Sequence, residues 1–307
     1  MSDQEANLKT YRANCHCAAY VYEVTLPEVT EASQCNCSIC YKKGALWVLP
    51  KYKDVKFVKG DPATLTNYTF GNKNFTHKSC STCGNSIMFV GYLEPPKPGE
   101  DKDPECGVNA RLFQHGQIDV WKLRLKKFDG ASSLKPAYEP PKFTGPEPVG
   151  EAEGDKLYTG SCHCGAITLA FKSKPVEDFT AEPDKHFTEQ LVECNCSNCA
   201  KAGYVWIYPK KPQVVIEGKE NLGMYLFGKK NVGKTFCKVC SVPIHNHMME
   251  FSEEELATKS QEERDWVVGG QIFSPVNLRT INGLDVNDLK VFQFQGYATL
   301  QPPYVEP

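Results

Sequence analysis

The stretch "CNCSICYKKGALWVLPK", residues 35–51, returns as "CNCSNCAKAGYVWIYPK" at residues 194–210. Ten of the seventeen positions are identical, and they include three cysteines, one glycine, one tryptophan and the closing proline-lysine pair. A C-x-C-x-x-C cluster supplies three thiols, whereas a closed structural zinc site takes four ligands. The stretch therefore indicates a duplicated unit whose cysteines suit an incomplete metal site.

The duplication continues on both sides of this stretch. Three further pairs of blocks follow the same order in both halves, and the offset from Cys15 to Cys162 is the length of a domain, so a whole domain has been copied. The pairs are "NCHCAAYVYEV" from residue 14 with "SCHCGAITLAF" from 161, "YTFGNKNFTHKSCSTC" from 68 with "YLFGKKNVGKTFCKVC" from 225, and "VNAR" from 108 with "VNLR" from 276.

A chain of 307 residues has room for two ordinary domains. We expect a first zinc domain at 1–135, a linker rich in proline, glycine and acidic residues at 136–156, and a second zinc domain at 157–307. Short segments such as "AAYVYEVTL" and "QVVIEG", punctuated by glycine and proline, are typical of strands. The predicted fold is mainly β: two tandem, zinc-stapled antiparallel β domains with few short helices. Ser252 and Glu255 form a capping-box pattern that predicts one such helix.

Composition excludes several classes of protein. The formal net charge is -2 and the sequence pI about 6.4, so no strong positive field favours nucleic acid. No stretch approaches the roughly 18 consecutive apolar residues of a membrane helix, and the first ten residues show no signal peptide. We therefore expect a cytoplasmic protein with no nucleic-acid or membrane partner. Fifteen cysteines at these spacings favour metal over the alternative of disulfides.

The cysteines divide into fours and threes. Each repeat has seven at matching places, and a tetrahedral structural zinc takes four, conveniently as two pairs from distant strands. Other groupings within the seven remain open from spacing alone. The predicted groups of four are Cys15, Cys17, Cys80, Cys83 and Cys162, Cys164, Cys237, Cys240. The predicted groups of three are Cys35, Cys37, Cys40 and Cys194, Cys196, Cys199.

A trio of thiolates without a fourth protein ligand is typical of an open site. With three thiolates the zinc complex carries a formal charge of -1, which suits it to hold an incoming thiol as thiolate rather than to activate water. The alternative is that a histidine or Cys106 closes the site. Cys106 has no cysteine counterpart in the second repeat, where Ser274 occupies its place, so it could close only one copy.

Other polar residues recur at matching positions. Asn109 with Arg111, and Asn277 with Arg279, are candidates for contacting an anionic substrate, because arginine presents a planar fork and asparagine both a donor and an acceptor. The alternative is a buried, turn-fixing asparagine beside a surface arginine.

Histidines, lysines and tryptophans near the motifs are expected to have plainer roles. The residues between the paired cysteines should be exposed or behind the ligands, because strand alternation turns them away. The other histidines should be ordinary strand residues, the lysines solvated, and the tryptophans part of the core. The residues between the paired cysteines are His16 and His163, and the other histidines are His245 and His247. The lysines are Lys51 and Lys210, and the tryptophans are Trp47 and Trp206.

With "CHC", "CNCSxC", C-x-x-C and "VN-x-R" in order, the sequence resembles the glutathione-dependent formaldehyde-activating enzyme family, which includes centromere protein V. The resemblance covers about 10–130 and again about 157–297. It implies a β-tent architecture and, in each domain, one structural four-cysteine zinc and one catalytic three-cysteine zinc. The family's last block usually reads F-C-x-x-C-G, whereas this chain has Ser79 for the phenylalanine and Ser241 for the glycine.

The resemblance implies a zinc-dependent carbon-sulfur lyase that acts on a thiol adduct such as S-hydroxymethylglutathione or a related glutathione conjugate. Its cofactors would be zinc, two per domain and up to four per chain, with glutathione as co-substrate. The catalytic ligands carried over are the two trios, and the expected partner is a small-molecule thiol or adduct. The alternatives are a non-catalytic zinc scaffold, or an enzyme with only one active repeat acting on another small metabolite.

Overall fold

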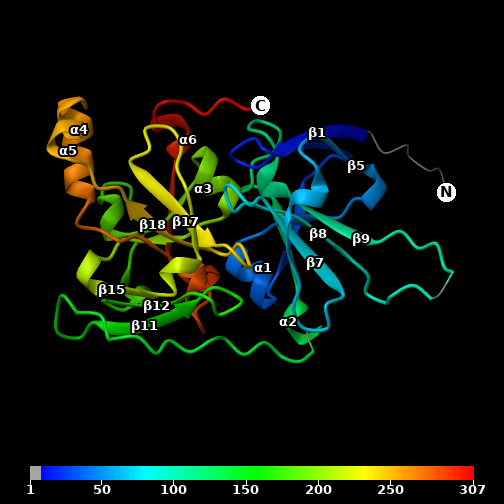
Figure 1. The fold of residues 1–307 in the computed structure, drawn as a ribbon, viewed down its shortest axis with the longest axis horizontal. Helices are drawn as coiled ribbons and strands as arrows, with labels where there is room; N and C mark the ends of the chain where they lie inside the picture. The colour runs from blue at the N-terminus through cyan, green and yellow to red at the C-terminus, as the bar shows by residue number, and fades with distance from the viewer. Residues whose placement is uncertain (1–7, 98, 134) are drawn as a thin grey trace. The chain divides into compact units, whose positions relative to one another are not determined.

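The computed structural model describes residues 8–97, 99–133 and 135–307 (Figure 1). These residues fall into two compact units. The first takes in the chain as far as Glu139 together with Ala200–Gly203 and Pro303–Pro307, and the second comprises Pro140–Cys199 and Tyr204–Pro302. No helix among the described residues is long and apolar enough to cross a membrane.

The two repeats contain the same series of strands. In the first repeat these are β1 (Leu8–Asn14), β2 (Val21–Pro27), β3 (Glu31–Cys35), β4 (Trp47–Val48), β5 (Val55–Lys59), β6 (Thr66–Tyr68), β7 (Phe75–Ser79), β8 (Ser86–Gly91), β9 (Glu105–Asn109) and β10 (Arg124–Phe128). In the second they are β11 (Lys156–Ser161), β12 (Thr168–Ser173), β13 (Leu191–Cys194), β14 (Trp206–Ile207), β15 (Val214–Glu217), β16 (Leu222–Tyr225), β17 (Val232–Cys237), β18 (Pro243–Met248), β19 (Val276–Asn277) and β20 (Val291–Phe294).

The helices are short and few. The first repeat has α1 (Ser38–Lys43) and α2 (Gly130–Ser133), and the second has α3 (Ser197–Ala202), α4 (Glu253–Ala257), α5 (Gln261–Gly270) and α6 (Gly296–Thr299). The mainly β prediction is confirmed. So is the predicted capping box: the Ser252 hydroxyl accepts the Glu255 N–H, and the Glu255 carboxylate accepts the Ser252 N–H, at the start of α4.

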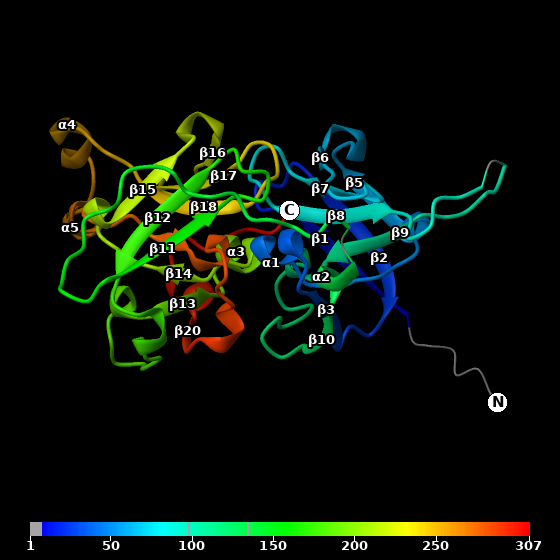
Figure 2. The ribbon, with the colours of Figure 1, turned by 90° about the horizontal axis from the view of Figure 1, so that it is seen from below.

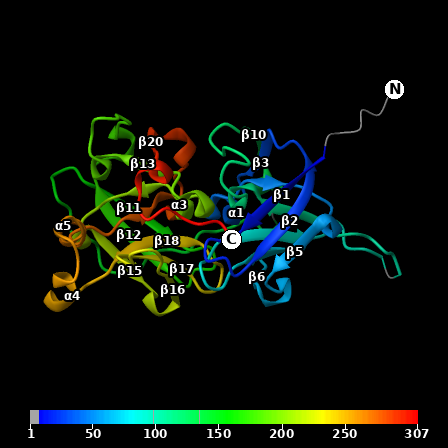
Figure 3. The ribbon, with the colours of Figure 1, turned by 90° about the horizontal axis from the view of Figure 1, so that it is seen from above.

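Each repeat builds one small and one large sheet. The small sheets have the orders β1-β2-β5 (Figure 3) and β11-β12-β15 (Figure 2). The large sheets have the orders β10-β3-β4-β9-β8-β7-β6 and β20-β13-β14-β19-β18-β17-β16, which match strand for strand. One strand pair in each repeat is parallel, β10 with β3 and β20 with β13, and the other pairs are antiparallel, as the prediction of antiparallel domains requires of most pairs.

Side-chain alternation explains how the strands face the core. In β2, Tyr22 and Val24 are buried, while Thr25 is exposed. Strand β12 is apolar at consecutive positions and is buried on both faces at Leu169, Ala170 and Phe171. The middle strand of the second small sheet is therefore covered on both of its faces.

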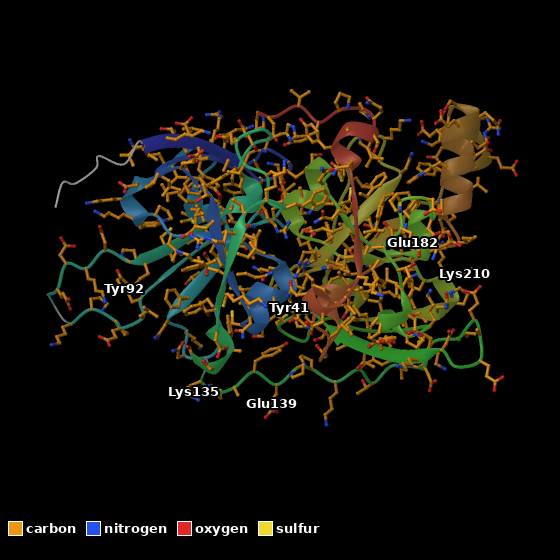
Figure 4. All side chains as sticks on the ribbon, turned by 180° about the vertical axis from the view of Figure 1, so that it is seen from behind. Tyr41, Tyr92, Lys135, Glu139, Glu182 and Lys210 are labelled. Carbon is orange, nitrogen blue, oxygen red and sulfur yellow. The ribbon has the colours of Figure 1, made fainter. Side chains whose placement is uncertain are left out.

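The copies differ most in the connection from β8 to β9 in the first repeat and from β18 to β19 in the second. In the first repeat the connection from β8 to β9 is a loop without helix or strand in its described residues, and Figure 4 labels Tyr92 at its start. The Tyr92 hydroxyl donates to the Lys102 carbonyl at 3.2 Å and so ties the two sides of the loop. The second repeat inserts α4 and α5 at the same place.

Candidate metal centres

Four cysteines from two turns come together in the first repeat. Cys15 and Cys17 follow β1, and Cys80 and Cys83 lie in the turn between β7 and β8. All four sulfurs lie within 4.8 Å of one another, at 3.6 Å between Cys15 and Cys17 and 3.5 Å between Cys17 and Cys80. Sulfurs bound tetrahedrally at about 2.3 Å from zinc are about 3.8 Å apart, so the group fits a structural zinc.

The second repeat reproduces this group. Cys162, Cys164, Cys237 and Cys240 lie within the same range, at 3.5 Å between the first two sulfurs and 3.6 Å between the second and third. Each group joins the beginning of its repeat to a hairpin far along the chain. An ion bound there would cross-link the small sheet to the large one and contribute directly to folding.

The turns that present these cysteines need a left-handed backbone in both repeats. The residue after Cys17 is Ala18, with φ 58°, and its counterpart is Gly165, with φ 84°. In the other turn the pattern is reversed: Gly84 has φ 73° and its counterpart Ser241 has φ 56°. Glycine adopts this conformation without steric cost, whereas a residue with a side chain does not, so one of the two turns of each four-cysteine group is strained.

Three cysteines form a second group in each repeat. Cys35 ends β3, Cys37 caps the N-terminus of α1 and Cys40 lies inside it, while the second repeat places its trio in the same way at the end of β13 and in α3. The sulfurs of each trio lie within 4.8 Å of one another. The Cys37 N–H also donates to the Cys35 sulfur at 3.4 Å, which fixes the bend between strand and helix.

Neither trio has a fourth protein ligand among the described residues, because no further histidine, cysteine, aspartate or glutamate brings a ligand atom into either group. Cys106 lies buried in β9 outside all four groups. His16 and His163 also lie outside them, but both are buried, so the alternative that they are exposed is wrong. Within the described residues each trio therefore offers three ligand atoms, one fewer than a closed tetrahedral zinc site takes.

The tryptophan of each copied stretch contacts the third cysteine of its trio. The Trp47 indole N–H donates to the Cys40 sulfur at 3.2 Å, and the Trp206 N–H donates to the Cys199 sulfur at 3.4 Å. Both side chains are buried, as expected of core residues. A buried indole N–H needs an acceptor, and here the acceptor is a sulfur of the trio, so the tryptophan also belongs to the site.

A glycine presses against the first cysteine of each trio. A Cβ added to Gly130 would lie 2.4 Å from the Cys35 sulfur, and one added to Gly296 would lie 2.4 Å from the Cys194 sulfur. Real Cβ atoms do not approach a heavy atom so closely, so only glycine fits. Both glycines begin the short helix that follows the parallel strand of their repeat. Figure 2 shows the parallel strand of the first repeat, β10, beside β3.

The asparagine between the first two cysteines of each trio holds the turn that follows the parallel strand, which we call the closing turn. In the first repeat the Asn36 amide donates to the Asp129 carboxylate at 2.8 Å, and its oxygen accepts the Ala131 N–H at 2.9 Å. In the second, Asn195 donates to the Gln295 amide oxygen at 2.7 Å and accepts the Tyr297 N–H at 3.0 Å. The C-N-C motif therefore binds the end of its repeat as well as offering two thiols.

Hydrogen bonding polarises the thiols. Bonds from Cys37 and Cys40 lower the pKa of the Cys35 thiol to about 3. In the second trio, bonds from the two partner cysteines hold the pKa of Cys199 well below its usual value, and the charge of Lys234 adds to the effect. The thiolate is the form that binds metal, so each trio has a sulfur ready for a soft cation at neutral pH.

The repeated asparagines and arginines serve the backbone. The Asn109 oxygen accepts the Leu46 N–H at 3.2 Å and the Arg111 N–H at 3.3 Å, and its amide donates to the Ser86 carbonyl at 3.0 Å. Asn277 makes the corresponding three bonds in the second repeat. Both asparagines therefore have the buried, turn-fixing role that was the alternative to contact with a substrate.

The arginines are buried, so the expectation of surface arginines in that alternative is not met. The Arg111 guanidinium donates to the carbonyl of Gly44 at 2.7 Å, directly after the helix that carries Cys40. Arg279 is buried in the same place of the second repeat. A contact of either arginine with substrate stays a prediction.

The remaining candidates lie away from the trios or on the surface. Lys51 and Lys210 are exposed, and Lys210, labelled in Figure 4, pairs with Glu151. His245 and His247 lie in β18 as ordinary strand residues. His245 is buried and its ring shares a 2.7 Å hydrogen bond with the Thr235 hydroxyl. Burial, with smaller contributions from the charges of His247 and Lys219, lowers its pKa to about 3.

Residues 10–98 match the family model of the glutathione-dependent formaldehyde-activating enzymes. The matched residues contain all seven cysteines of the two groups in the first repeat. A solved structure of a Rhodobacter sphaeroides protein is 21% identical and covers 45% of this chain and 99% of its own, with a TM-score of 0.30. The family match confirms the resemblance for the first repeat.

Proposed function

Because residues 10–98 match the family model of the glutathione-dependent formaldehyde-activating enzymes, we propose that this protein is a zinc-dependent carbon-sulfur lyase. Its substrate would be a thiol adduct such as S-hydroxymethylglutathione or a related glutathione conjugate. The observation that carries the proposal is the cysteine trio, present twice and without a fourth protein ligand in the described part of the chain. On this proposal each repeat holds two zinc ions, so the chain holds four.

The reaction breaks one bond between carbon and sulfur. In an S-hydroxymethyl adduct the electron pair of that bond moves to sulfur, the hydroxyl oxygen forms the carbonyl of formaldehyde, and its proton is released. The products are a thiolate and an aldehyde, and the reverse direction forms the adduct from the same atoms. A zinc ion bound by three thiolates supplies a soft fourth position that stabilises the thiolate form of the departing sulfur.

The chain's own groups prepare the trio for another negative sulfur. Trp47 donates to the third thiolate, and the N–H groups of Cys37 and Gly130 bond to the first. Each bond takes up part of the charge of a thiolate, so less is left to repel the incoming sulfur. Asn36 keeps the Gly130 donor in place, because its two bonds, to Asp129 and Ala131, join the trio to the last helix of the repeat.

The test is to empty the trios separately. Cys37→Ser and Cys196→Ser each remove one trio, and the double variant removes both. We expect each single variant to lose one zinc ion and part of the turnover of S-hydroxymethylglutathione, and the double variant to lose all turnover while its far-UV circular dichroism is unchanged. Cys106→Ala is the matched control because Cys106 lies outside every group, and it should keep four zinc ions and full activity.

The alternatives give different results. A zinc scaffold would have no turnover to lose and would unfold when a trio is emptied. An enzyme with one working repeat would lose all turnover in one single variant and none in the other. Turnover that persists unchanged in the double variant contradicts the proposal.

A further inference from the structure

The trios are alike, but the strands beside them carry different side chains. In the second repeat Lys234 of β17 lies directly opposite Asn246 of β18. The matching pair in the first repeat is His77 of β7 opposite Phe89 of β8. Side chains directly opposite one another in an antiparallel pair project from the same face, so each pair forms one wall beside its trio. We name these the Lys-Asn wall and the His-Phe wall.

The Lys-Asn wall places a positive charge at the second trio. The Lys234 ammonium lies 3.9 Å from the Cys199 sulfur, 4.8 Å from the centre of the Trp206 ring and 5.4 Å from that of Tyr204. Its side chain is 9% exposed. An ammonium has three N–H donors, and Cys199 is the one hydrogen-bond acceptor that the described residues give it. A bound anion could therefore use the others.

Asn246 adds an acceptor without a donor. The residue is 9% exposed, and its side-chain oxygen has no hydrogen-bond partner in the described structure. A buried amide oxygen left without a partner is costly, so such an atom points to a group that arrives from outside. The wall thus offers a donor with positive charge and, across the strand pair, an acceptor for an N–H group.

The His-Phe wall is aromatic. The Phe89 ring packs edge-on against Trp47 with 4.9 Å between ring centres, and His77 lies 6.3 Å from Trp47 and 6.2 Å from Phe89. Two buried cations, Lys42 and Lys43, follow Cys40 in α1, and the Lys43 ammonium donates to the Ser79 hydroxyl at 3.0 Å. The first trio therefore has an aromatic surface where the second has an ammonium and an amide.

We infer that the two trios select different thiols: the second favours thiols that carry a carboxylate and a neighbouring N–H, and the first does not discriminate by charge. The carboxylate pairs with the Lys234 ammonium, and the N–H donates to the Asn246 oxygen. This inference rests on the proposed function, because it assigns a substrate class to the same sites. It makes Lys234 and Asn246 the residues that determine specificity.

The test uses two ligands that differ in one charge. N-acetylcysteine has a carboxylate and an amide N–H, and N-acetylcysteine amide is its uncharged counterpart. Calorimetric titration of the zinc-loaded Cys37→Ser protein reports binding at the second trio, and the Cys196→Ser protein reports the first. We expect the acid to bind at least about tenfold more tightly than the amide at the second trio, since a charge-assisted hydrogen bond is lost with the amide. We expect nearly equal binding at the first.

Substitutions on the walls should move this preference. Lys234→Met should abolish it, by weakening the acid about tenfold and leaving the amide unchanged. If Lys234 only balanced the charge of the trio, both ligands would weaken equally, which would overturn the inference. The exchange of walls, Lys234→His with Asn246→Phe, should reproduce the behaviour of the first trio, and zinc content shows whether the site is intact. Lys234→Met covers the case in which the double variant does not fold.

Binding and turnover are read separately, so the two proposals can fail separately. Selective binding at the second trio without turnover of either hydroxymethyl adduct would contradict the lyase proposal and leave the specificity intact. Turnover of both adducts, with the acid and the amide bound equally tightly at both trios, would contradict the inferred specificity and leave the lyase proposal standing.

Discussion

The two repeats share their metal-binding residues and differ in the side chains beside them. Both have the same two cysteine groups, the same indole bond to the third thiol and the same glycine against the first. They differ in the wall next to the trio and in which turn of the four-cysteine group is strained. The shared features are those that bound metal requires, and the different ones are free to set substrate preference and stability.

The largest expected effect separates the two kinds of group. Cys80→Ser and Cys237→Ser each break a four-cysteine group, and structural zinc contributes about 10–16 kcal/mol of folding free energy in small zinc domains. We expect the affected repeat to lose its cooperative thermal transition, whereas Cys37→Ser leaves both transitions in place. Scanning calorimetry with zinc analysis measures this. A folded Cys80→Ser repeat would show that the group is not structural.

The glycine against the first thiol tests the trio without touching a ligand. Gly296→Ala puts a Cβ 2.4 Å from the Cys194 sulfur, so the ligand must move, and we expect zinc affinity at the second trio to fall roughly 10–100-fold. The control is Gly269→Ala in the same unit, where a Cβ meets nothing within 4 Å. Competition with a chelator measures the affinity. Equal affinities in the two variants would show that the close approach has no role.

Acid should destabilise the second repeat through a histidine that the first replaces with Met88. The pKa of His245 is about 3 in the fold against 6.5 ordinarily, so the unfolded chain binds a proton between these values and the folded chain does not. The stability that the neutral His245 ring contributes is fully present above pH 6.5. As pH falls from 6.5 towards 3, the free energy of unfolding decreases by about 1.4 kcal/mol per pH unit. Denaturant titrations between pH 7 and 5 should show that the free energy of unfolding depends less on pH in His245→Asn than in the unchanged protein. The same pH dependence in both proteins would contradict this.

The smallest expected effect comes from the turns. Ser241→Gly and Ala18→Gly each place glycine where the backbone is left-handed, and each should raise the free energy of unfolding of its own repeat by about 0.5–1 kcal/mol. Gly84→Ser should lower it by a similar amount. Urea titrations of the zinc-loaded protein measure all three. A loss of stability in Ser241→Gly would show that the serine side chain stabilises its turn.

The duplication and the cysteine spacing predicted much of this architecture. The cysteine spacing indicated the same division of fourteen cysteines that the structure brings together, and the short segments between glycines and prolines indicated a mainly β fold. They could not show that Trp47 donates to Cys40, because an aromatic residue in a strand reads as core and its N–H partner depends on tertiary packing.

The parallel strand and its glycine were also missed. The signal was present, since "FDG" at 128–130 matches "FQG" at 294–296, but an identity of two residues after the last metal motif indicates no chemistry until the backbone brings the glycine to the thiol. The walls were hidden for a related reason. Which side chains of β7, β8, β17 and β18 stand beside a trio depends on strand register, and the sequence does not state the register.

The open fourth position of each trio can be examined directly by anomalous diffraction at the zinc edge, using crystals soaked in N-acetylcysteine. The account predicts four zinc ions: two surrounded by four protein sulfurs, and two held by three protein sulfurs with the ligand's sulfur as the fourth. A protein side chain completing the coordination at both trios would contradict it.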